Sequence, residues 1–295
     1  MTINRRSSKR ISTTSLKTSA GSSNDKQQRS TKKQKLTTTK KKIHWSRPGV
    51  EAAARLVSLP ISSSSSSSVD NNIKSWNTAL SHYESMIKAK GNTKLYNLDQ
   101  QRRLIAQQWR EDYIQNEECS MTKDQLLNVI IPWKFGKGKP RNALKPLLQS
   151  NKELDVTRAS MLAFNFAESS IANNTTNKED GDVNHVQEAI KALCQLSGVG
   201  PATASAVLSA YCPQSFAFMD DEVIECLYEA KRGYTLKIYL AVNGRCVDIA
   251  KELNGVSCGG SSGGWTPADV AKALWTVATM SARNDEVGLC KVFGD

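Results

Sequence analysis

The chain has 295 residues and a formal net charge of +12, from 40 basic and 28 acidic residues. Residues 1–47 hold fourteen of the basic residues and one acid, Asp25, so the remaining 26 basic and 27 acidic residues leave residues 48–295 nearly neutral. No apolar run reaches membrane-spanning length and no secretory signal core is present, so we expect no membrane partner. The seven cysteines contain no C-x-x-C pair. This argues against a zinc site or a four-cysteine iron–sulphur cluster, and we expect no cofactor.

Residues 1–47 form a basic tail rich in Ser, Thr and Gln. Such a composition offers too little apolar surface to offset the entropy of ordering, and we expect the tail to be disordered. Lysines cluster at 32–35 and 40–42, which is typical of a nuclear localisation signal or of an arm that binds polyanions. Two alternatives stay open: a merely solvated tail, and organellar import, because residues 1–24 are rich in Ser and Arg and have no acid. The lysine clusters favour the nucleus.

Helical patterns begin after the tail. A short helix is predicted over Ala52 to Leu59, and the serine run from Ser62 to Ser68 is expected to be a flexible surface loop. From Ile73 an apolar stripe at helical spacing predicts a helix that ends at Gly91-Asn92; its members are Trp76, Leu80, Tyr83 and Ile87. Leu104 to Tyr113 is expected to form the next helix.

A capping box is indicated at Thr122 to Gln125, opening a helix over Leu126 to Ile131 that Pro132 is expected to close. The later predicted helices are Asn142 to Leu148, Arg158 to Phe166, Val186 to Leu196, Val223 to Ala230, Leu236 to Leu253 and Pro267 to Ala282, the last capped by Thr266. No alternating strand pattern or internal repeat occurs, so the predicted class is all-α. We expect one domain over residues 48–295, with loops near 61–72, 171–184 and 255–264.

A basic segment between two predicted helices holds four cations and two glycines. The cations are Lys134, Lys137, Lys139 and Arg141, and their density favours contact with an anion such as a nucleic-acid phosphate. Trp133 and Phe135 could stack on bases or anchor the segment in the core. The second interpretation of these aromatic residues is as well supported as the first.

Leu196 to Ala204 reads Leu-Ser-Gly-Val-Gly-Pro-Ala-Thr-Ala and joins two predicted helices. Its two glycines can adopt positive φ and leave no side chain between the backbone and an approaching group, and Pro201 suits the first turn of a helix. The start of that helix would offer unpaired N–H groups to a phosphate oxygen. The residues expected to contact phosphate are Ser197, Gly198, Val199, Gly200, Ala202 and Thr203. The alternative is a helical corner whose glycines serve only close packing.

This string resembles the hairpin, written LPGVGxxTA, of the helix-hairpin-helix DNA glycosylase superfamily. In that family the catalytic aspartate follows the hairpin at a fixed distance, and with Leu196 as position one the matching position, twenty-five, is Asp220. The basic segment loosely resembles an earlier turn of the same fold. The resemblance implies a helical glycosylase-like domain, a monomer that binds the DNA backbone, and an aspartate that stabilises charge on the sugar of a flipped nucleotide.

The chain also departs from this family. Ala202 stands where strand-cleaving members carry a lysine, so the resemblance implies no Schiff-base step at that position. Asp221-Glu222 replaces the usual Thr-His after the aspartate, and these acids also suit the first turn of a helix. The run GVGPATAS resembles eukaryotic proteins of unassigned activity, in which the aspartate matches Asp221. Two functions therefore stay open: a monofunctional DNA N-glycosylase, and a non-catalytic DNA- or chromatin-binding module with the same fold. The sequence does not distinguish DNA from RNA.

Overall fold

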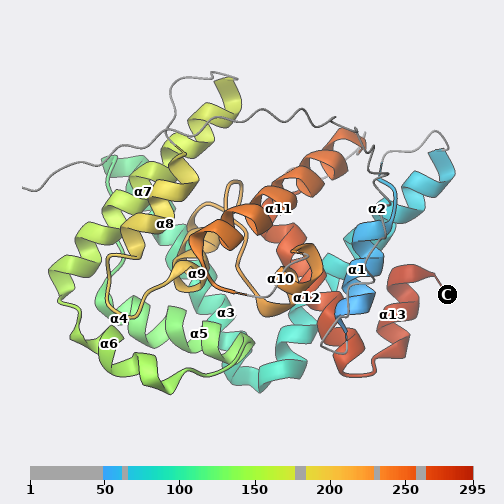
Figure 1. The fold of residues 1–295 in the computed structure, drawn as a ribbon, viewed down its shortest axis with the longest axis horizontal. Helices are drawn as coiled ribbons and strands as arrows, with labels where there is room; N and C mark the ends of the chain where they lie inside the picture. The colour runs from blue at the N-terminus through green and yellow to red at the C-terminus, as the bar shows by residue number, and fades with distance from the viewer. Residues whose placement is uncertain (1–48, 62–65, 177–183, 229–232, 257–263, 295) are drawn as a thin grey trace, which may run out of the picture. The chain divides into compact units, whose positions relative to one another are not determined.

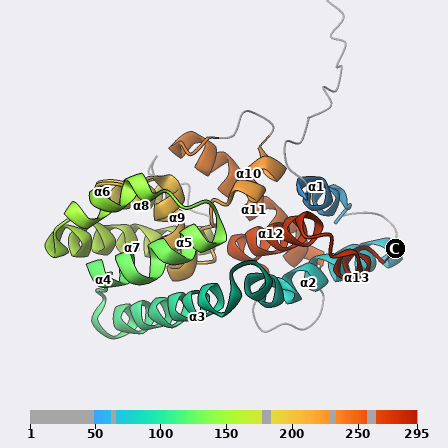
Figure 2. The same cartoon turned by 90° about the horizontal axis from the view of Figure 1, so that it is seen from below.

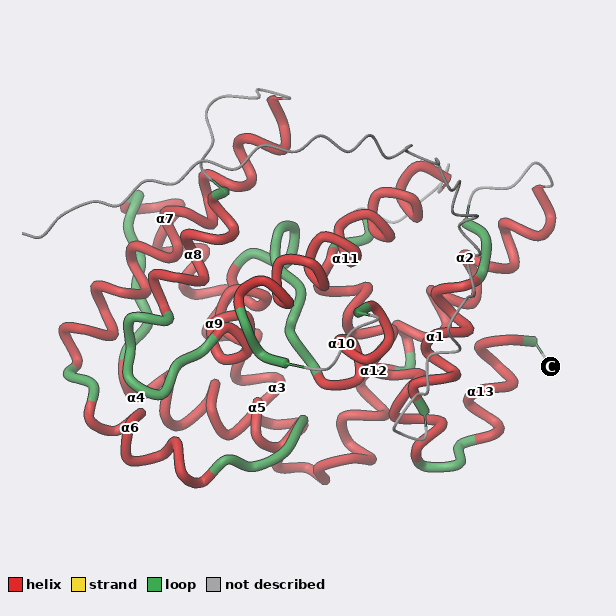
Figure 3. The backbone as a smooth tube through the Cα atoms, in the orientation of Figure 1, coloured by secondary structure: helices red, strands yellow, loops and turns green. Residues whose placement is uncertain are grey.

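The computed structural model describes residues 49–61, 66–176, 184–228, 233–256 and 264–294, all within one compact unit that spans residues 43–295. The described residues form helices joined by short connections and contain no strand (Figure 1 and Figure 3), which confirms the all-α class. The predicted disorder of the basic tail concerns residues outside the described ranges.

The helices follow one another without long interruptions. In chain order they are α1 (Val50–Ser58), α2 (Ser66–Ser81), α3 (Tyr83–Asn116), α4 (Lys123–Gln125), the π-helix η1 (Leu126–Ile130), α5 (Ile131–Lys137), the 3-10 turn η2 (Asn142–Leu144), α6 (Lys145–Ser150), α7 (Glu153–Thr176), α8 (His185–Leu193), α9 (Pro201–Tyr211), α10 (Asp221–Leu227), α11 (Leu236–Val256), α12 (Pro267–Ala282) and α13 (Glu286–Phe293).

Two groups of helices share the long helix α3. In one group α12 packs against α1, α2, α10 and α11, and α13 packs against α2 (Figure 1). In the other group α7, α8 and α9 pack on one another. The 34 residues of α3 contact α2 and α12 of the first group and η1, α5 and α9 of the second (Figure 2). Asp220 directly precedes α10 of the first group and accepts a hydrogen bond from Lys137 of α5, so it lies where the two groups meet.

Helix α9 is buried on nearly every side. Its residues from Ala202 to Ser209 and Tyr211 are all buried, because the small side chains of this helix let neighbouring helices approach closely. Arg102 of α3 crosses to it and donates hydrogen bonds to the carbonyl oxygen of Ala206 at 2.7 and 2.9 Å and to Ser209 Oγ at 2.7 Å. The helix that follows the hairpin is thus a fixed element of the core.

Several boundaries predicted from the sequence are wrong. The helix predicted from Ile73 to Gly91 is divided between α2 and α3 at His82, and the helix predicted over Leu104 to Tyr113 is part of α3. The helix over Gly91 does not end there but continues to Asn116. A Cβ at residue 91 would stand 2.3 Å from Leu95 Cβ, so glycine serves close packing at this position and does not end the helix. Pro132 does not close a helix but lies in the first turn of α5, where its missing N–H costs little. Residues 66–68 of the serine run begin α2, whereas residues 62–65 lie outside the described ranges.

Candidate nucleic-acid interface

The two glycines of the hairpin have different conformations. Gly198 has φ +76°, and a Cβ there would stand 3.1 Å from Leu147 Cβ and from Leu148 Cγ, so the position needs glycine both for its backbone and for packing on α6. Gly200 has φ −113°, an extended conformation open to any residue, and a Cβ there would meet nothing within 4 Å. Gly200 therefore does not have the positive φ that a glycine can adopt. Its lack of a side chain leaves the surface in front of α9 uncovered.

Asn151, which the sequence analysis did not single out, holds the hairpin in place. Its Oδ1 accepts the Ser197 N–H at 2.8 Å, and its Nδ2 donates to the carbonyl oxygens of Ser197 and Leu148, each at 3.0 Å. The buried side-chain amide of Asn151 thus provides hydrogen-bond partners for the N–H and the carbonyl oxygen of Ser197 and for a carbonyl oxygen of α6. No local pattern marks this residue, because its partner on the hairpin lies 46 positions along the chain.

The hairpin and part of the basic segment line one cavity of about 320 Å³. Its walls are formed by hairpin residues from Gly198 to Thr203, together with Lys134, Arg141, Leu144 and Tyr234. Gly200 is the N-cap of α9 and no side chain caps this helix, so the positive end of its dipole faces the cavity. Ser197 and Lys139 are exposed and do not line the cavity.

The cations of this cavity differ in their environment. Burial, followed by the repulsion of Arg141, lowers the pKa of Lys134 to about 8. The Arg141 guanidinium lies over the ring of Tyr234, 4.5 Å from its centroid, and is held there by a cation–π contact. The Tyr234 hydroxyl donates a short hydrogen bond to Asp221 Oδ1. Tyr234 was missed because nothing in its local sequence connects it with the hairpin.

Lys137 is buried away from this cavity. It ends α5 instead of lying in an exposed loop, and only 2% of its side chain is exposed. Its Nζ donates to Asp220 Oδ2 at 2.5 Å. Four aromatic rings have their centroids within 5.5 Å of the Nζ atom, those of Trp275, Phe218, Tyr83 and Trp133. Trp133 and Phe135 are themselves buried, in agreement with an anchoring role in the core.

Asp220 is held in place by the loop that precedes α10. Its side chain does not cap that helix but accepts from Lys137, and only 4% of it is exposed. Burial raises the pKa of the Asp220 carboxyl to about 6, although Lys137 acts in the opposite direction. Ser205 Oγ accepts the Met219 N–H at 3.1 Å, and Asn243 binds the N–H of Ala217 and the carbonyl oxygen of Ser215. Neither Asp220 nor Asp221 lines the hairpin cavity.

Comparisons of the chain with family models, curated proteins and solved structures give no match. Within the described ranges, no group of three or more His, Cys, Asp or Glu side chains is placed to hold a metal ion. The search of the same residues for a helix with the length and apolar character of a membrane span finds none.

Proposed function

We propose that this protein binds DNA through the phosphate backbone. The observation that carries the proposal is the hairpin cavity, in which the uncapped start of α9, Lys134 and Arg141 converge. A helix start presents backbone N–H groups and a partial positive charge to an anion. In α9 Pro201 has no N–H and the Thr203 N–H donates to the Gly200 carbonyl oxygen at 2.8 Å, so the phosphate would be met by the Gly200 and Ala202 N–H groups. Arg141 adds a planar set of donors that matches the geometry of a phosphate.

The shape of the site supports the backbone as the target. Gly200 leaves the surface before α9 without a side chain, so a strand can approach the N–H groups closely. The described polar lining consists of cations, backbone groups, a threonine and a tyrosine, which suit phosphate and sugar contacts more than readout of base edges. The basic tail would add non-specific attraction and deliver the protein to the nucleus, as its lysine clusters predict.

A second candidate function is a monofunctional DNA N-glycosylase on a helix-hairpin-helix glycosylase fold. It is favoured by Asp220, which has the expected spacing from the hairpin and is buried at the start of α10 without capping it. In this candidate a flipped nucleotide would displace Lys137 from the carboxylate. Asp220 would then stabilise positive charge on the sugar and orient the attacking water. Its pairing with Lys137 favours the binding module as the first candidate.

Binding is tested with a labelled short duplex and fluorescence anisotropy over a range of salt concentrations. The double variant Lys134→Gln/Arg141→Gln should weaken binding. It should also reduce the slope of log Kd against the logarithm of salt concentration by up to about two, because two phosphate contacts are lost. The matched control is Lys237→Gln/Lys251→Gln, which removes two exposed cations of α11 outside the cavity. Equal affinities for both variants would contradict the proposal. An RNA duplex of the same sequence tests the preference for DNA.

Catalysis is tested with duplexes that carry alkylated, deaminated, oxidised or mismatched bases. An enzyme should release a base and leave an intact abasic site, and Asp220→Asn should abolish release while DNA is still bound. Asp221→Asn is the matched control, and it tests whether Asp220 or the neighbouring Asp221 is the acid required for base release. Absence of release from every duplex leaves the binding module as the function.

A further inference from the structure

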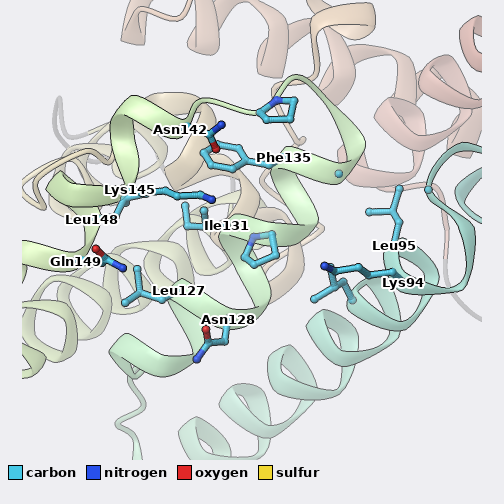
Figure 4. Close-up of a pocket in the computed structure, with 15 residues that line it drawn as sticks. Lys94, Leu95, Leu127, Asn128, Ile131, Phe135, Asn142, Lys145, Leu148 and Gln149 are labelled. Atoms are coloured by element: carbon cyan, nitrogen blue, oxygen red, sulfur yellow. The ribbon is translucent and has the colours of Figure 1, made fainter.

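A second cavity, of about 600 Å³, shares no lining residue with the hairpin cavity, although both take residues from α5 and η2. It is a groove between α3 on one side and η1, α5 and α6 on the other (Figure 4). The proposed DNA contacts do not use it.

Two rows of apolar side chains line the groove, one on each side. On one side Leu127, Ile131 and Phe135 follow one another every four residues along η1 and α5. On the other side Leu95 and Leu98 lie on one face of α3. At a rise of about 1.5 Å per residue, the eight residue steps from Leu127 to Phe135 extend over roughly 12 Å, or about two turns of a helix. An elongated slot of this kind suits a helix that inserts a row of apolar side chains.

The π-helix η1 contributes to the shape of this groove. Leu126–Ile130 makes one wide turn before α5, and its residues Leu127 and Asn128 line the groove. Isolated π-helical turns are uncommon and occur frequently at functional sites, because the wide turn displaces side chains from the regular helical positions. This observation is independent of the apolar character of the lining.

Two cations flank the apolar floor from opposite sides. Lys94 extends from α3 and Lys145 from α6, and their amines point into the groove (Figure 4). Both side chains are exposed, and neither forms an ion pair with another described residue. A ligand that fills this groove is therefore expected to be apolar along its centre and acidic on both sides.

We infer that the groove binds an amphipathic helix of a partner protein whose apolar stripe is flanked on both sides by Asp or Glu. The stripe would contact Leu98 and Leu127, which are partly exposed, and the small exposed parts of Leu95, Ile131 and Phe135. Lys94 and Lys145 would each face one acidic flank. A small amphiphilic acid carries one head group and would leave one of the two cations without a partner. Nucleic acid offers phosphates but no apolar stripe for Leu127, Ile131 and Phe135.

The test uses the full-length protein and a labelled synthetic peptide of about 14 residues, near the minimum length for a helix in water, with leucines at helical spacing and glutamates on both flanks. Three probes serve for comparison: the same peptide with lysine flanks, the same peptide with serines in place of the leucines, and dodecanoate. We expect saturable binding of the first peptide and at least tenfold weaker binding of the other two peptides.

Variants locate the binding in the groove, since the basic tail also attracts acidic peptides. Lys94→Glu/Lys145→Glu should weaken binding at least tenfold, whereas the charge-matched control Lys237→Glu/Lys251→Glu should change it less than twofold. Asn128→Trp, which places a large side chain at an exposed lining position without altering the charge, should also weaken binding. Melting curves establish that each variant is folded. The inference is overturned if the peptide does not bind, if both charge-reversed variants behave alike, or if dodecanoate alone depends on Lys94 and Lys145.

Discussion

Lys137 Nζ lies 2.5 Å from Asp220 Oδ2, and both side chains are almost completely buried among aromatic rings. Removal of one partner would leave the other charged group buried without compensation. We therefore expect Lys137→Met and Asp220→Asn to lower the free energy of unfolding by about 3–5 kcal/mol each. The double variant should lose clearly less than the sum of the two. Urea unfolding of the four proteins measures this coupling, and additive losses would show that the pair contributes no interaction energy.

The hairpin glycines should respond differently to substitution. Gly198→Ala places a side chain in a left-handed conformation against Leu148 and should cost about 1–2 kcal/mol of stability from the backbone alone. Gly200→Val meets open space and an extended backbone, so stability should change little. Its branched side chain should nevertheless lower DNA affinity, because it covers the start of α9. A folded Gly200→Val protein that binds DNA as tightly as its parent would remove Gly200 from the DNA interface.

Asn151→Ala should lower stability by about 1–3 kcal/mol, because it leaves the buried N–H and carbonyl groups of Ser197 without their partner. DNA affinity should fall as well, since the hairpin loses its attachment to α6. Thermal unfolding and anisotropy measure the two effects. Asn128→Ala, an exposed amide bonded to Asp124, is the control and should change neither quantity appreciably.

DNA binding should weaken as the pH rises through about 8, where Lys134 loses its proton. The sign follows from the lowered pKa: the amine is a cation below this pH and neutral above it. The loss should be about tenfold or more, as expected for one charge-assisted hydrogen bond of about 1.5–3 kcal/mol. Lys134→Arg should abolish this step because a guanidinium stays protonated. An identical pH profile in both proteins would remove Lys134 from the interface.

Deletion of residues 1–47 removes thirteen net positive charges. We expect the melting temperature of the remaining domain to stay the same, and non-specific DNA binding to become weaker and less dependent on salt. The logarithm of Kd, plotted against the logarithm of salt concentration, gives the slope for both proteins. An unchanged slope would exclude the tail from DNA binding. Microscopy of the full chain tests the nuclear prediction, and mitochondrial accumulation would contradict it.

Features with local causes were predictable from the sequence. The capping box of Thr122 and Gln125 and the cap of Thr266 are present, because each depends on residues within one turn. Helix α12 has the predicted bounds. Gly200 and Arg141, which the sequence indicated separately as anion contacts, line one cavity in the structure.

Features with distant causes were not predictable. Lys137 looked like a surface cation, and its burial depends on an aspartate 83 residues later. Asn243 fixes the loop before Asp220 from 26 residues away. The short helix α13 was missed altogether, although Asp285 caps it. For Lys137 and Asn243 the deciding partner lies outside the window in which propensity and periodicity operate, whereas the cap of α13 lies within one turn and was overlooked.

Arg102 makes the stable docking of α3 depend on the presence of α9. Its hydrogen-bond partners in α9 lie 104 and 107 residues further along the chain, so the guanidinium has none of them until Ser209 has been synthesised. A buried guanidinium without partners is costly, which opposes stable docking of α3 before α9 exists. Contacts of such long range also close a large loop and slow the search for the native state. A nascent chain that ends before α9 should therefore remain protease-sensitive across α3, and protection should appear only once the hairpin helix has left the ribosome.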